Sequence, residues 1–238
     1  MIHDIAAAIG ATSRIVRKRE RDGKPAEAVI AERTYDTGIK DLWDALTNPE
    51  RLPRWFSPVT GDLKLGGRYQ VEGNAGGTVT VCDPPKTLEL TWEFGGTVSW
   101  VEVHLHAVSE DETHLQLVHE GHIDPAWAEK YGPGATGVGW DLGLLGLQTH
   151  IASGWSKPPE ADMEWTRTDE YKLFVRKSSA GWRDASVAAG NDQRALILVF
   201  LEISVAVHMI GNVAAGGGIS PVGHVTILLN KARPFGPC

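Results

Sequence analysis

The stretch TGVGWDLGLLGLQTHIAS, residues Thr136–Ser153, decides the fold that this sequence predicts. Its bulky apolar residues recur at the spacing of one face of an α-helix. They are Trp140, Leu144, Leu147 and Ile151, and Leu142 and Leu145 widen the apolar stripe. A helix that is apolar over more than half of its circumference cannot lie on a wet surface. We therefore expect it to sit in a groove that covers most of it.

Four glycines interrupt this helix, at positions 137, 139, 143 and 146. Each costs about 1 kcal/mol of helix propensity relative to alanine. Two explanations stay open for them. Either the helix packs closely on a sheet, or a ligand approaches its backbone.

Between residues 59 and 120 the apolar pattern changes to a period of two, broken by short turns rich in Gly, Pro, Asn and Asp. This pattern predicts an antiparallel meander of about six strands with one covered face and one wet face. The covered face carries Leu88, Leu90, Trp92, Phe94, Ser99, Val101, Val103 and Leu105. We expect the helix at 136–153 to be the cover.

Other elements flank the meander. An amphipathic helix is predicted at 2–19, a strand at 27–35, a helix from Asp36 or Thr37 to Leu46, and a further helix at 168–189. Pro49 fits the first turn of a second short helix that runs through Trp55. The large apolar side chains of these two short helices are expected in the core or in one wall of a pocket; they are Trp43, Trp55 and Phe56.

Composition limits the classes of function. The chain has 238 residues, a net charge of −7 and a pI near 5.7, which argues against a nucleic-acid partner. Its two cysteines, Cys82 and Cys238, offer no zinc-binding spacing. No basic segment followed by an apolar core marks a secretory signal, so a cytoplasmic location is expected.

Four segments together resemble a known family: LWDALTNPERLPRWF (42–56), DLKLGGRYQVEGNAGGTV (62–79), CDPPKTLELTWEF (82–94) and GVGWDLGLLGL (137–147). They are similar to the START-like SRPBCC superfamily, in the branch of the C-terminal domain of the heat-shock protein 90 ATPase activator. This resemblance implies an α+β helix-grip fold of the START/Bet v kind. In that fold a curved antiparallel sheet wraps around a long C-terminal helix, here with helical extensions.

The resemblance and the patterns divide the chain into four parts. They are an N-terminal helical extension (1–23), the SRPBCC helix-grip domain (24–154), a C-terminal helical extension (155–190) and an apolar, glycine-rich tail (191–238). The tail departs from the family. It is interpreted as a membrane or partner anchor with 195–215 as the candidate span, as an extra helix, or as the product of a shifted reading frame.

Histidines are the first candidates for chemistry. His104 and His106 form an H-x-H pair, but they fall on the wet face of their strand and we expect no metal there. His119 is in phase with Leu115 and Leu117, so it points inward. It is interpreted as a hydrogen-bond anchor for a ligand, a general base, or a satisfied core residue.

Two further features have plain explanations beside the functional ones. Asp141 lies near the start of the long helix, where it either meets His119 or favours the positive end of the helix dipole. The loop Gly73–Gly77 joins two strands and lacks the lysine of a P-loop, so it is predicted to be a hairpin loop.

The sequence thus predicts a protein that binds a small hydrophobic or aromatic ligand between the sheet and the long helix. The expected lining residues are Tyr69, Trp92, His119, Trp140 and Leu144. No cofactor, metal or nucleic acid is expected, and membrane association is expected only if the tail provides it. The resemblance leaves two alternatives open. One is a co-chaperone that activates the heat-shock protein 90 ATPase, and the other is a polyketide cyclase- or dehydratase-like enzyme that uses His119 and Asp141.

Overall fold

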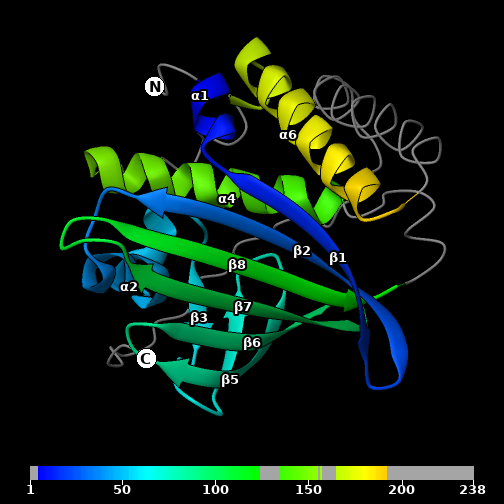
Figure 1. Cartoon of the computed structure of the whole chain (residues 1–238). Helices are drawn as coiled ribbons and strands as arrows, with labels where there is room; N and C mark the ends of the chain where they lie inside the picture. Colours follow the sequence, from blue (N-terminus) through cyan, green and yellow to red (C-terminus); the bar gives the residue numbers. More distant parts are fainter. Residues whose placement is uncertain (1–4, 124–133, 155, 157–164, 192–238) are drawn as a thin grey trace, which may run out of the picture.

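A computed structural model describes residues 5–123, 134–154, 156 and 165–191 (Figure 1). It confirms the α+β helix-grip class. The sheet has eight antiparallel strands in the order β1-β2-β8-β7-β6-β5-β4-β3. Their bounds are Ser13–Arg21, Lys24–Tyr35, Val59–Gly61, Arg68–Val71, Gly76–Asp83, Thr87–Phe94, Thr97–Ala107 and Thr113–His122 for β1 to β8. The six-stranded meander predicted between residues 59 and 120 is β3 to β8.

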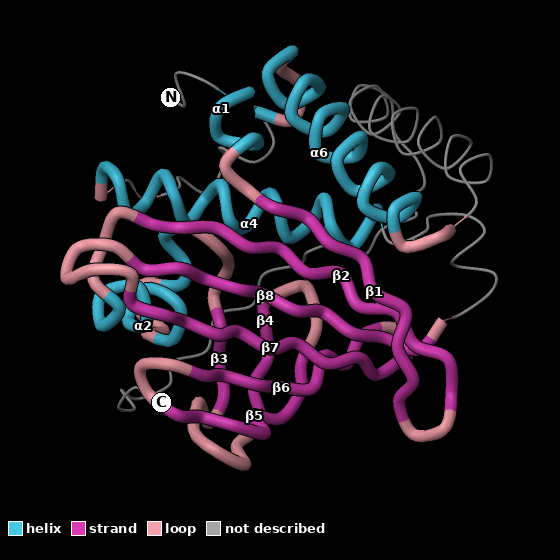
Figure 2. Tube along the Cα trace, in the orientation of Figure 1, coloured by secondary structure: helices cyan, strands magenta, loops and turns pink. Residues whose placement is uncertain are grey.

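The long helix α4 spans Gly134–Ser153 and is covered on two sides (Figure 2). The sheet lies on one side, and the helices α1 (Ile5–Gly10) and α6 (Asp169–Ala188) lie on the other. Leu147 packs in the core against the sheet, while Leu145 packs with apolar residues of α1 and α6. This double burial explains why α4 is apolar around most of its circumference, and it confirms the predicted groove.

Two short helical elements close one end of the space between the sheet and α4. Helix α2 spans Ile39–Thr47, and the short helix predicted after Pro49 is the 3₁₀ turn η1, Leu52–Arg54. Helix α6 begins where the sequence predicts, because the Thr168 hydroxyl accepts a hydrogen bond from the Tyr171 N–H at 3.2 Å.

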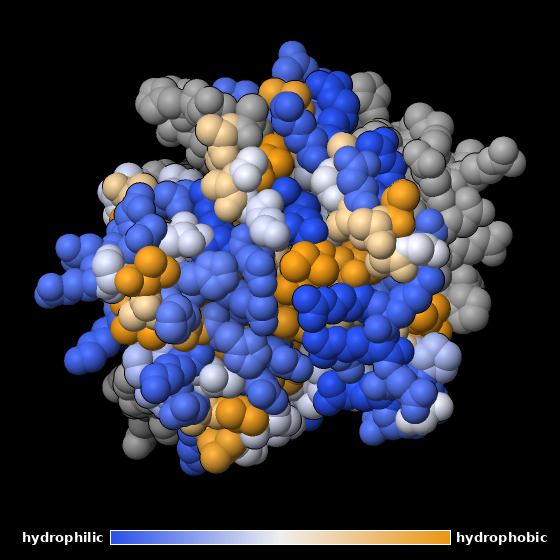
Figure 3. Space-filling view, viewed as in Figure 1, coloured by the Kyte–Doolittle hydropathy of each residue, from blue (hydrophilic) through white to orange (hydrophobic). Residues whose placement is uncertain are grey.

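The period-two pattern places side chains on the sheet as expected. Val103, Leu105, Leu115 and Leu117 are buried on the inner face. The opposite face, turned to the viewer in Figure 3, is mainly hydrophilic over the sheet. His104 and His106 lie on this outer side; His104 Nε2 is 3.2 Å from the carboxylate of Glu102.

The predicted N-terminal helix at 2–19 is wrong over most of its length. The helix ends at Gly10, and Ser13–Arg21 forms the edge strand β1, which pairs with β2 from Ser13↔Glu32 to Arg21↔Lys24. The β-branched residues Ile15 and Val16 suit a strand, and the ladder to β2 outweighs the local helical spacing. Such pairing depends on a distant segment, which a local pattern does not reveal.

The tail from residue 192 on, with its candidate span at 195–215, lies outside the described residues. Among the residues that the structure describes, no helix is both long and apolar enough to cross a bilayer.

Candidate functional site

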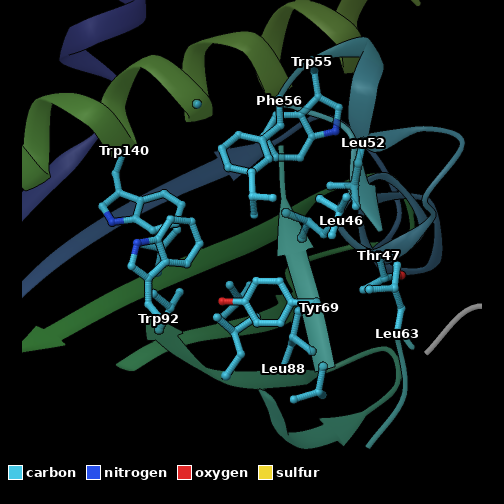
Figure 4. A pocket seen from close by; sticks show the side chains of 18 of the residues that line it. Leu46, Thr47, Leu52, Trp55, Phe56, Leu63, Tyr69, Leu88, Trp92 and Trp140 are labelled. Carbon is cyan, nitrogen blue, oxygen red and sulfur yellow. The ribbon is translucent and has the colours of Figure 1, made fainter. Parts of the chain in front are cut away.

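A cavity lies between α4 and the inner face of the sheet, with α2 and η1 at one end (Figure 4). The volume of this cavity is about 130 Å³. Its lining consists of Leu46, Thr47, Leu52, Trp55, Phe56, Val59, Leu63, Tyr69, Val71, Val79, Leu88, Leu90, Trp92, Val101, Val103, Leu115, Leu117, Trp140, Gly143 and Leu144. The lining is therefore almost entirely aliphatic and aromatic.

Four of the five predicted site residues line this cavity. Tyr69 reaches it from β4, Trp92 from β6, and Trp140 and Leu144 from α4. His119 of β8 is not one of the lining residues. Its ring instead packs edge-on against those of Trp92 and Trp140, at centroid distances of 6.0 and 5.8 Å.

Both ring nitrogens of His119 are engaged within the protein. The indole N–H of Trp140 donates to His119 Nδ1 at 2.9 Å, so Nδ1 carries no proton and Nε2 does. Nε2 then donates to Ser99 Oγ at 2.8 Å, and the Ser99 hydroxyl donates to the carbonyl of Trp92 at 3.1 Å. Burial lowers the pKa of His119 to about 4, which keeps the ring neutral near pH 7.

This tautomer does not suit nucleophilic catalysis. A histidine that activates a serine must accept the hydroxyl proton, whereas His119 Nε2 donates toward Ser99. In a catalytic triad the group behind the histidine accepts a hydrogen bond from it, whereas Trp140 donates a hydrogen bond to His119. Ser99 and His119 are therefore arranged as links in a structural hydrogen-bond chain.

The structure does not bring Asp141 and His119 together. Asp141 is 4% exposed, and its Oδ2 accepts from Arg14 Nε at 2.8 Å, from Trp182 Nε1 at 3.1 Å and from the Ser178 hydroxyl. These partners belong to β1 and α6, on the side of α4 away from the cavity. No local pattern in the sequence marks this cluster, because its members lie between 37 and 127 residues from Asp141.

The other polar groups of the cavity wall also have partners inside the protein. Tyr69 Oη donates to the Thr91 carbonyl at 2.7 Å, Thr47 Oγ1 to the Trp43 carbonyl at 2.8 Å, and Trp55 Nε1 to the Ala45 carbonyl at 2.9 Å. Burial raises the pKa of Tyr69, so its hydroxyl stays protonated. With Trp140, four polar side chains of the wall thus direct their donors at protein acceptors.

Trp55 and Phe56, which the sequence places in the core or in a pocket wall, line the cavity. Trp43 instead packs within the buried core. Across the described part of the chain, no three His, Cys, Asp or Glu side chains gather closely enough to hold a metal ion.

Comparison with known proteins places this architecture in a family. Residues 36–152 match the family described as activator of Hsp90 ATPase homolog 1-like protein. The helix-grip domain of this chain is an SRPBCC domain of that activator-like branch. The match confirms the resemblance seen in the four sequence segments. No curated protein matches the chain.

Solved structures show the same fold. The crystal structure of CalU16 from Micromonospora echinospora is 27% identical, with a TM-score of 0.59, and the match covers 76% of this chain and 99% of that one. The solution structure of CalU16 gives 27% identity, a TM-score of 0.62, and coverage of 75% and 97%. A conserved protein of unknown function from Enterococcus faecalis, EF2215, is 15% identical over 75% of this chain and 92% of that one, with a TM-score of 0.52. The last likeness concerns the fold alone.

Proposed function

We propose that this activator-like domain binds a neutral apolar small molecule, aromatic or hydrocarbon, in the cavity between α4 and the sheet. The observation that carries the proposal is the wall chemistry. The cavity is lined by aliphatic and aromatic side chains, and four polar side chains of the wall already donate to protein acceptors. Ligand sites are typically of this apolar kind.

The same chemistry argues against a polar ligand. A donor or acceptor carried into this cavity would lose its water and find few partners, at a cost of about 1–3 kcal/mol per group. The space also limits size. An apolar cavity of about 150 Å³ is enough to hold benzene, so about 130 Å³ suits a ligand body of about one ring, and naphthalene with two rings probes the upper limit of its size.

Gly143 offers a direct test. A Cβ added there would have Phe56 Cδ2 as its nearest neighbour, at 4.0 Å, so a side chain can enter the cavity without a backbone clash. Gly139 is a matched control on the same helix, because it is exposed and a Cβ there would meet nothing within 4 Å. Gly143→Leu should fill the cavity, and Gly139→Leu should leave it open.

The measurement is titration with naphthalene, followed by tryptophan fluorescence and calorimetry. Wild type and Gly139→Leu should bind with similar affinity, and Gly143→Leu should bind at least about tenfold more weakly. Equal binding by all three proteins would place the ligand elsewhere. No binding by wild type at micromolar protein would mean that the cavity is only a packing defect of the core.

The family match supports a second candidate, a partnership with an Hsp90-type chaperone. Its test is the ATPase rate of the chaperone with stoichiometric amounts of this protein. Several-fold stimulation would support the co-chaperone function, and an unchanged rate would count against it. Gly143→Leu separates the two candidates, because filling an internal cavity should not alter an effect exerted through the surface.

A further inference from the structure

Two tryptophans form one end of the cavity. Trp92 from the sheet and Trp140 from α4 face each other there, and Leu46, Leu52 and Thr47 lie toward the opposite end (Figure 4). The two indole rings have centroids 5.4 Å apart and planes tilted by 58°. Any ligand in the cavity therefore meets this indole pair at one of its ends.

Trp140 has little support from its own helix. At Gly143, one turn further on, a Cβ would meet nothing closer than Phe56 at 4.0 Å. This glycine thus leaves open space beside the indole and does not pack against it. Trp140 is oriented by its contact with the ring of Trp92 and by its hydrogen bond to His119.

The hydrogen-bond chain joins both halves of this end wall. It begins at the Trp140 indole, passes through His119 and Ser99, and ends at the main-chain carbonyl of Trp92. Each link has one donor and one acceptor, so the chain has a single direction. Its geometry specifies where Trp140 lies relative to the strand that carries Trp92.

We infer that His119 is a positioning residue that holds Trp140 across the end of the cavity and thereby sets the length of ligand that the cavity accepts. This inference rests on the proposed binding function. Beyond the wall, Phe94 follows Trp92 on the same face of β6 and is 54% exposed. Release of Trp140 would let a longer apolar ligand extend toward this residue.

The test compares two probes of different length, naphthalene with two rings and phenanthrene with three. His119→Leu removes the acceptor for Trp140, whereas His119→Asn keeps an oxygen close to the place of Nδ1. His104→Leu on the outer face is the matched control, since His104 contacts Glu102 and not the cavity. Trp140→Phe removes the indole N–H donor itself, and it replaces His119→Leu in the test if that variant does not fold.

In wild type, naphthalene should bind more tightly than phenanthrene. His119→Leu and Trp140→Phe should each move the ratio of the two dissociation constants toward phenanthrene by about tenfold. His119→Asn and His104→Leu should stay near wild type. An unchanged ratio in His119→Leu, in a protein that still binds naphthalene, would overturn the inference.

Hydrogen exchange of the Trp140 indole N–H reports how firmly Trp140 is held, and it needs no ligand. The NMR signal of this N–H is assigned by its absence in Trp140→Phe. The exchange should be at least about tenfold faster in His119→Leu than in wild type and His104→Leu. Exchange that is equally slow in all three would also overturn the inference. If wild type binds neither probe, the proposed function fails, and the exchange rates alone then decide whether His119 positions Trp140.

Discussion

Trp140 and Asp141 are adjacent in the sequence, yet they hold α4 from opposite sides. The Trp140 indole donates to His119 on the sheet, and the Asp141 carboxylate accepts from Trp182 of α6. One side of the helix thus faces the cavity and the other carries a buried polar cluster. The candidate binding site and the attachment of α6 are separated by the thickness of one helix.

Acid should destabilise the protein through His119. Its pKa falls from 6.5 to about 4 on folding, because burial penalises the charged ring. The unfolded chain therefore binds a proton between these values while the folded protein does not, so stability is greatest above pH 6.5 and is lost as the pH falls toward 4. Between pH 7 and pH 5 this contribution amounts to about 2 kcal/mol.

Urea unfolding at a series of pH values measures this effect. His119→Leu should lose less stability than wild type over the same range, by about 2 kcal/mol. Parallel slopes for wild type and His119→Leu would mean that His119 titrates normally in the folded protein.

Replacement of Asp141 should be among the most damaging changes. Asp141→Ala leaves Arg14, whose side chain is 9% exposed, without its carboxylate, and it deprives Ser178 and Trp182 of their acceptor. Removing one partner of a buried ion pair costs about 3–5 kcal/mol. Asp184→Ala is the control, because that exposed carboxylate pairs with Arg183 at the surface, where an ion pair contributes about 0–1 kcal/mol.

Chemical denaturation compares the two variants. A loss below 1 kcal/mol for Asp141→Ala would show that the cluster contributes little. A sharp drop in affinity for naphthalene, with the fold intact, would instead link Asp141 to the cavity and contradict its placement behind α4.

The inner faces of the strands and the long helix were predictable because each depends on a local period. Period two places His119 on the inner side of β8, and the helical period places Trp140 toward the sheet. The hydrogen bond between them was not predictable, since it requires the packing of α4 on β8. The strand β1 was missed for a related reason, because it forms only by pairing with β2.

The sequence alone allows two explanations for the glycines of α4, and in the structure the four positions have three different surroundings. A Cβ at Gly137 would lie 2.3 Å from the ring of Trp182, and one at Gly146 would lie 2.6 Å from the Trp55 carbonyl. These two glycines allow close packing. Gly143 lines the cavity, and Gly139 faces open space.

This difference predicts opposite effects for the same substitution two residues apart. Gly139→Ala should raise stability by about 1 kcal/mol, because it improves helix propensity and meets no neighbour. Gly137→Ala should lower stability by about 1–3 kcal/mol, because Trp182 is fully buried and cannot move aside without repacking α6. Thermal and urea unfolding of the two variants beside wild type provide the measurement. If both variants were more stable than wild type, the Trp182 ring of α6 could not lie as close to position 137 of α4 as the structure has it.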